Sequence, residues 1–206
     1  MTIYSLYIYD RHCACVYYHD WHRTKPPRVA NEGGGILPAV SHQIYPRKDG
    51  AALDTNPRNT LMSSSGIIVA VNDEVPRTPL PGATQQVPAN AGLPFDEEAK
   101  LVYGVVLSLR NMVKKISGKD EGFVNYRTST YKLHLYETLS GYKFIMLSDP
   151  NADSLRFVMR QIYAGPFLEY VVRNPLTQMD SKESGIDNEY FRTSIDRMIR
   201  GLSVFN

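Results

Sequence analysis

The amino-acid sequence predicts a three-layer α/β/α domain, in which a mostly antiparallel sheet is covered by helices on both faces. The predicted elements follow in the order strand, strand, helix, three strands, helix, helix. Short turns join most of the successive strands, which favours antiparallel pairing. Two strands, residues 2–9 and 142–148, are apolar on both sides. Strands of that kind are central in a sheet and need a cover on each face.

Composition limits the size and the class of the protein. The 206 residues suffice for one domain plus additional material, and 43% hydrophobic residues suffice for a core. Because 23 Lys and Arg residues face 21 Asp and Glu residues, the net charge of +2 favours neither nucleic acid nor an anionic membrane as the main ligand. Two cysteines, no signal peptide and no apolar run of about 18 residues predict a soluble, cytosolic protein.

The first two strands are predicted to form an N-terminal hairpin. Residues 2–9 (TIYSLYIY) form the first strand, and Cys13 to Trp21 form the second. A short polar turn, residues 10–12, connects them.

The composition changes at residues 22–94. Ten of the chain's 13 prolines fall in this range, together with runs of Gly33–Gly35 and Ser63–Ser65. These features predict a long and mostly disordered insertion within a single domain of residues 1–206. Within it, the apolar segment 66–71 is interpreted as either a short strand or a docking peptide. Thr78, which precedes a proline, is either a phosphorylation site or plain linker.

A helix is predicted from Phe95 to Ser117, and it carries more apolar surface than one small sheet can cover. Acidic residues in its first turn and Lys114 and Lys115 in its last turn match the helix dipole. We expect one row to face the sheet: Leu101, Val105, Leu109, Met112 and Ile116. We expect a second row to face a partner: Tyr103, Val106, Leu107 and Ser108. The alternative is a central helix of a larger monomeric core.

The C-terminal half is predicted to add three strands and two helices. The strands span residues 122–128, 131–138 and 142–148. A helix capped by Asn151 or Asp153 is predicted to run to residue 173, with a kink at the Gly165–Pro166 pair. The last helix is predicted from Asn188 to Leu202.

Residues suited to catalysis or metal binding are few. Cys13 and Cys15, with nearby histidines, suggest a zinc site, but two cysteines on an extended strand hold their sulfurs too far apart for one ion. A cysteine nucleophile paired with one of these histidines is the enzyme hypothesis, and it lacks an oxyanion loop and an orienting third group. We therefore expect no catalytic residues, no metal and no cofactor.

Four blocks of the chain resemble one family. They are IYSLYIYDRHCACV, EEAKLVYGVVLSLRNMV, TSTYKLHLYETLSGYKFIMLSD and IYAGPFLEYVVRNP. In this order they are similar to the smallest longin-like (sybindin/sedlin-type) subunits of the transport protein particle (TRAPP) complex. The resemblance covers residues 1–21 and about 95–206, and residues 22–94 depart from the compact version of the family.

The resemblance implies a longin-like fold, an α/β (α+β) class with a five-stranded antiparallel sheet, one helix on one face and two on the other. It also implies a non-catalytic subunit of a complex that tethers ER-derived vesicles at the Golgi and promotes nucleotide exchange on a Rab GTPase. Expected partners are other small TRAPP subunits, especially a second longin-like subunit, and that GTPase. The expected location is peripheral to cis-Golgi and vesicle membranes, with no direct membrane insertion and no nucleic acid.

From exposure alone, the candidate partner surface comprises Tyr103, Val106, Leu107 and Arg110, joined by the Asp10–His12 turn. The alternative function is a longin domain of another trafficking class that binds peptides, either an adaptor small chain or a SNARE head. A SNARE head would be followed by a heptad helix and a membrane anchor, and neither follows the last predicted helix.

Overall fold

The structure of the protein is a computed structural model. All the residues that it describes belong to one compact unit, formed by residues 1–46 and 92–206. The described residues are 2–23, 27, 37–44, 93–118, 123–177 and 184–202. The predicted segment 66–71 and Thr78 lie outside them.

A five-stranded antiparallel sheet forms the centre of this unit, as predicted. The strands are β1 (Ile3–Tyr9), β2 (Cys15–Asp20), β3 (Asn125–Arg127), β4 (Lys132–Glu137) and β5 (Lys143–Ser148). Their order across the sheet is β2-β1-β5-β4-β3. The two strands expected to be central, β1 and β5, therefore pair with each other. Several strands are shorter than predicted, because β2 begins at Cys15 instead of Cys13 and β3 has only three residues.

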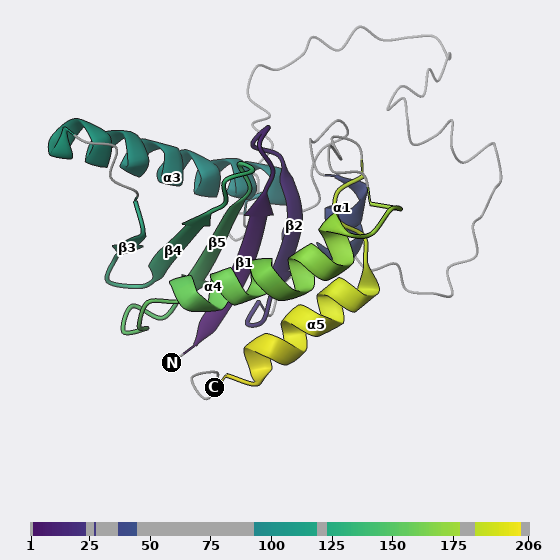
Figure 1. Ribbon diagram of the computed structural model, residues 1–206. Helices are drawn as coiled ribbons and strands as arrows, with labels where there is room; N and C mark the ends of the chain where they lie inside the picture. Colours follow the sequence, from purple (N-terminus) through teal and green to yellow (C-terminus); the bar gives the residue numbers. More distant parts are fainter. Residues whose placement is uncertain are drawn as a thin grey trace, which may run out of the picture. The chain divides into compact units, whose positions relative to one another are not determined.

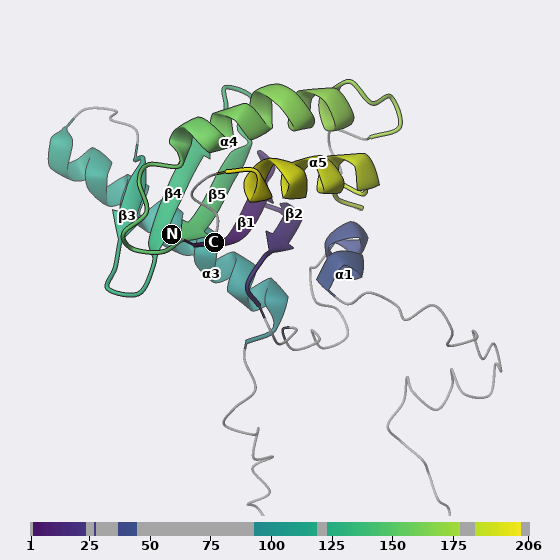
Figure 2. The ribbon, with the colours of Figure 1, turned by 90° about the horizontal axis from the view of Figure 1, so that it is seen from below.

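Helices cover both faces of the sheet, which confirms the three-layer prediction. Helix α3 (Phe95–Ser117) lies on one face, whereas α4 (Arg156–Ile162), its continuation η1 (Tyr163–Val172) and α5 (Glu189–Arg200) lie on the other (Figures 1 and 2). Side chains alternate along a strand, so Tyr7 and Tyr9 reach α3 while the fully buried Leu6 and Ile8 face the opposite layer. The doubly apolar sequence of β1 thus reflects burial on both sides.

The two edges of the sheet differ. Along β2, the backbone N–H of Ile186 donates to the carbonyl of Val16 at 2.8 Å, and a short helix, α1 (Pro38–Ile44), packs nearby. At the opposite edge, all three residues of β3 are exposed. Helix α1 was not predicted, and it lies inside the range expected to be mostly disordered. Leu37, which directly precedes α1, and the helix residues Val40 and Ile44 are buried and recur at steps of three and four, which is the helical period.

The layer formed by α4, η1 and α5 departs from the prediction at the start of α4. Helix α4 follows Leu155 with no side-chain cap, so Asn151 and Asp153 do not cap it. Pro166 does not break the helix, which continues as a π-helix through Val172. Proline lacks the N–H of the α-helical ladder, and the wider π-helical register accommodates it. As predicted, Asn188 begins the last helix, and its side chain accepts from the N–H groups of Tyr190 and Phe191.

A buried histidine connects this layer to the sheet. His134 on β4 is almost fully buried, its Nε2 lies 2.9 Å from the hydroxyl of Ser148, and its Nδ1 accepts the N–H of Leu155 at 3.4 Å. Burial, with a smaller contribution from Lys132, lowers the pKa of His134 to about 4. The imidazole is therefore neutral near pH 7, with Nε2–H as the donor to Ser148.

Candidate interaction surface on helix α3

Helix α3 has the bounds that the sequence predicts. Its first turn carries Asp96, Glu97 and Glu98, and its last turn carries Lys114 and Lys115. Gly118 ends the helix in the left-handed conformation, with φ of 64°, and its N–H donates to the carbonyl of Lys114.

The faces of α3 are arranged differently from the prediction. Val106, expected to contact a partner, is only 2% exposed and packs in the chain's own core with Phe95 and Ala99. The row expected to cover the sheet is instead largely exposed: the exposed fractions are 57% for Leu101, 50% for Met112 and 79% for Ile116. We call Leu101, Val105, Met112 and Ile116 the exposed stripe.

Polar contacts fix the first turn of α3 on the sheet. The Tyr7 hydroxyl donates to Glu98 Oε1 at 2.7 Å, and the Tyr9 hydroxyl donates to the carbonyl of Ala99 at 2.7 Å. Arg23, which follows β2, forms an ion pair with Glu98 at 2.6 Å. Burial and the neighbouring Tyr18 and Glu98 raise the pKa of Tyr7, so this hydroxyl stays protonated and acts as a donor. The helix therefore presents a fixed outer face.

The four predicted candidates do lie together, with one of them buried. Tyr103, Val106, Leu107 and Arg110 line a shallow hollow between α3 and β4, together with Leu135, Glu137 and Lys143. Arg110 pairs with Glu137 at 3.1 Å, and Lys143 Nζ lies 3.8 Å from the same carboxylate and 5.8 Å from the centre of the Tyr103 ring. The exposed members available to a partner are thus Leu107 and Arg110, with Tyr103 half-buried.

The Asp10–His12 turn lies next to this hollow. Asp10 Oδ1 accepts the N–H groups of His12 and Ala14, and Cys13, with φ of 69°, donates its thiol to the Tyr103 hydroxyl at 2.7 Å. Burial and this contact raise the pKa of Tyr103 to about 12. The β4–β5 turn is also close, since a Cβ on Gly141 would lie 3.1 Å from Cβ of Arg11. Two turns and α3 therefore meet at one end of the sheet.

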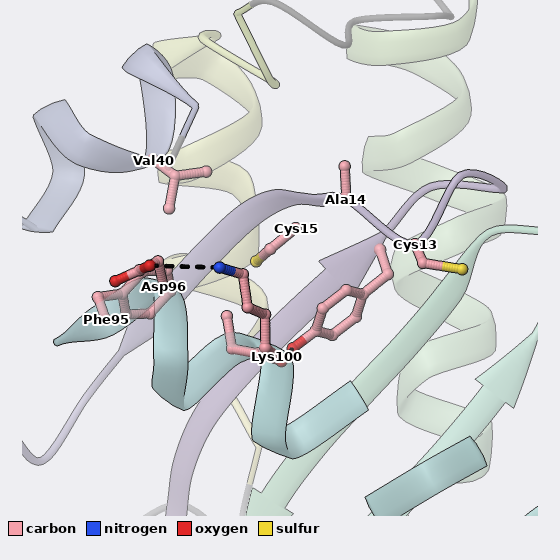
Figure 3. A pocket seen from close by; sticks show the side chains of 9 residues that line it. Cys13, Ala14, Cys15, Val40, Phe95, Asp96 and Lys100 are labelled. Carbon is pink, nitrogen blue, oxygen red and sulfur yellow. Dashed lines mark hydrogen bonds and ion pairs between the residues drawn. The ribbon is translucent and has the colours of Figure 1, made fainter. Parts of the chain in front are cut away.

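The two thiols have different environments, which corrects the expectation that both lie on the strand. Cys13 lies exposed in the turn, whereas Cys15 begins β2, and their side chains point apart (Figure 3). Burial raises the pKa of Cys15 to about 12, which makes it a poor nucleophile. Both line a pocket of about 140 Å³ between the turn, α1 and the start of α3.

The described residues lack two features, a metal-binding cluster and a membrane-spanning helix. Among these residues, no three His, Cys, Asp or Glu side chains are placed to hold a metal ion together. No helix in the described part of the chain combines the length and the apolar character needed to cross a membrane. The expectations of no metal and no cofactor stay predictions.

The architecture is a longin fold, since one helix covers one face of a five-stranded antiparallel sheet and two cover the other. Residues 3–202 match the Sybindin-like family, and the chain belongs to that family. The exposed stripe was missed because periodicity shows that a helix has apolar faces without showing which one its own sheet covers.

Relatives with similar sequences are subunits of one kind of complex. The chain is 36% identical over 208 residues to the transport protein particle subunit bet5 of Schizosaccharomyces pombe, covering 100% of both chains. It is 28% identical over 208 residues to the human trafficking protein particle complex subunit 1, covering 100% of this chain and 97% of the relative. It is 27% identical over 186 residues to BET5 of Saccharomyces cerevisiae, covering 89% and 80%.

Proposed function

We propose that the protein is a non-catalytic core subunit of a transport protein particle complex, which tethers vesicles between the ER and the Golgi and promotes nucleotide exchange on a Rab GTPase. Support comes from full-length similarity to relatives named as subunits of such particles. In this role the protein acts at the cytoplasmic side of cis-Golgi and ER-derived vesicle membranes without inserting into them.

The observation that carries this proposal is the exposed stripe. Four large apolar side chains on one face of α3 have no cover among the described residues, and α3 continues beyond the β3 edge of the sheet (Figures 1 and 2). A contiguous apolar face of this kind marks a protein–protein contact. The adjacent β3 edge offers a further contact, because an exposed edge strand can pair with another chain.

The partner proposed for the stripe is a second longin-like subunit. A trafficking protein particle complex subunit 4 is 34% identical to this chain over 59 residues, which cover 29% of this chain and 26% of that subunit. That relative is a subunit of a particle complex and resembles this chain in sequence, which makes it a suitable candidate. We take a subunit-4-type chain from the same species as the partner to test.

We propose a second contact surface, toward a neighbouring subunit or the GTPase. It comprises the hollow at Tyr103, Leu107 and Arg110 together with the Asp10–His12 turn. Its mixed character, with Leu107 beside the Arg110–Glu137 pair, suits a contact that forms and dissociates. In this mechanism no bond is made by the subunit. A platform that binds the nucleotide-free GTPase more tightly than the loaded form lowers the affinity of the GTPase for nucleotide by the same ratio.

Capture of the subunit-4-type chain tests the stripe. Met112→Asp places a carboxylate on the exposed stripe, so we expect the isolated chain to fold normally and its affinity for the partner to fall at least tenfold. Thr193→Asp, an exposed change on α5 in the opposite layer, is the matched control and should bind as the wild type does. The measurement is titration of purified chains, with native mass spectrometry for the stoichiometry.

Two outcomes would contradict this proposal. If Met112→Asp binds the partner with wild-type affinity, the stripe is not the contact. If the chain captures no small particle subunit but binds sorting peptides in titration, the adaptor alternative is favoured. Val106→Asp is unsuitable for this test, because a carboxylate at that buried position would unfold the domain.

A further inference from the structure

Two segments from distant parts of the chain close the edge of the sheet at β2. The carbonyl of Val16 accepts the backbone N–H of Ile186 at 2.8 Å. The carbonyl of Tyr18 accepts the side-chain amide of Gln43 in α1, with the amide nitrogen turned toward β2. An edge strand pairs with another chain through backbone groups of this kind. On β2 both carbonyls are already occupied by groups of the same chain.

The segment that precedes α5 fits closely against β2. Gly185 has φ of 78°, in the left-handed region, and a Cβ on it would lie 3.0 Å from the carbonyl oxygen of Val16. The same Cβ would lie 3.4 Å from the Cβ atoms of Leu37 and Ala39. The N–H of Ala39 donates to the carbonyl of Ser184 at 2.8 Å. The strand, this segment and α1 therefore meet at a point that requires glycine.

Helix α1 depends on this site for its structure. A helix of seven residues is marginal in water by itself, so packing must hold it. Val40 is 1% exposed and lines the same pocket as Cys15, and Ile44 is 8% exposed. The amide oxygen of Gln43 accepts Nη2 of Arg192 at 3.0 Å, which connects the helix to α5. Helix α1 is thus held beside β2 (Figures 1 and 2).

The outer side of β2 is complementary to itself. Antiparallel pairing of two copies of β2, centred on Tyr17, sets Val16 of each copy opposite Tyr18 of the other. These are the residues whose carbonyls lie on the outer side of the strand. The same register sets Cys15 opposite His19, so like charges do not meet. Because both copies use the same surface, such a contact closes as a dimer.

We propose that residues 37–44 and 184–186 form an autoinhibitory cap, which we call the edge cap, that prevents β2 from pairing with β2 of a second copy. The occupant of the edge after displacement of the cap is therefore a second copy of this chain. The cap assigns a task to residues 37–44, which lie within the proline-rich range of the sequence. This inference does not depend on the function proposed above, because it concerns the opposite edge of the sheet from β3.

Displacement of α1 tests the edge cap. Val40→Asp places a carboxylate at a buried position of α1 and should release the helix, whereas Pro38→Asp adds the same charge at an exposed position and is the matched control. Both variants carry Met112→Asp, so that the exposed stripe does not contribute to self-association. In sedimentation velocity over a concentration series, we expect Val40→Asp to dimerise at least tenfold more tightly than Pro38→Asp.

Hydrogen exchange locates the contact. In dilute solution the amides of β2 should exchange faster in Val40→Asp than in the control, and at concentrations where the dimer forms they should be protected again. Protection of α3 or β3 in the dimer, with β2 still open, would show that another surface pairs and would overturn the proposal.

A second variant keeps the test decisive if Val40→Asp does not fold. Gly185→Ala disturbs the segment at Val16, and Gly104→Ala, where a methyl group has open space on α3, is its control. We expect Gly185→Ala to show the same faster exchange in β2 and the same gain in dimerisation. Folded variants with an open β2 that stay monomeric would show that the cap blocks no pairing. Unchanged exchange of β2 in the folded variants would show that these residues do not protect the edge, and either result overturns the proposal.

Discussion

The buried His134 predicts how the stability of the domain depends on pH. Its pKa falls from an ordinary 6.5 to about 4 on folding, so between these values the unfolded chain binds a proton that the folded chain does not. Stability from this group is therefore complete above about pH 7 and is lost as the pH falls toward 4. Because one pKa unit corresponds to about 1.4 kcal/mol, the loss is about 3 kcal/mol in the free energy of unfolding.

Urea unfolding of the wild type and of His134→Gln, measured between pH 7.5 and pH 4, isolates this contribution. Other titrating groups act on both proteins, so the difference between the two free energies of unfolding reports on residue 134. At pH 7.5 the variant should be the less stable, since the contacts to Ser148 and Leu155 are disturbed. The difference should shrink by about 3 kcal/mol as the pH falls to 4. A difference that does not change with pH would refute this account of His134.

Two further predictions concern the thiols and the ion pair at the start of α3. With a pKa of about 12, the half-buried Cys15 is ionised to only about one part in ten thousand at pH 8. Ellman's reagent should therefore modify Cys13 much faster than Cys15 in the folded protein, and both thiols readily in urea. Equally fast reaction of both thiols in the folded protein would contradict the raised pKa of Cys15. Glu98→Ala should lower the free energy of unfolding by about 2 kcal/mol, because the Tyr7 hydroxyl and Arg23 lose their acceptor. Glu97→Ala, a change at an exposed neighbour, should alter the free energy of unfolding by less than about 0.5 kcal/mol. Equal effects of the two substitutions in urea unfolding would show that the Glu98 contacts do not stabilise the fold.

The layers of the fold were predictable because strong local signals agree with the tertiary structure. The apolar faces of β1 and β5 required two covering layers, and turn residues such as Gly141, with φ of 87°, marked the hairpin between β4 and β5. The bounds of α3 were predictable because its first-turn acids and Gly118 are end signals.

The surface of α3 was harder to predict, and the reason is physical. The exposed Leu101 and Met112 and the buried Val106 are all apolar, so only packing against Tyr7, Tyr9 and the rest of the sheet decides which row is covered. The π-helical form of the segment through Pro166 was not predictable for a similar reason. Surrounding packing retains a helix where local propensity favours a break.

The contact between Arg23 and Glu98 has a consequence for how the sequence can change over time. It joins the residues on either side of the long excursion from β2 to α3, so the sheet and α3 keep their positions whatever the length of the chain between those two points. Closing a loop becomes costlier only slowly with length, by about 0.6 kcal/mol for each doubling. A change of chain length between these two points that leaves residues 37–44 in place should therefore cost the domain little stability.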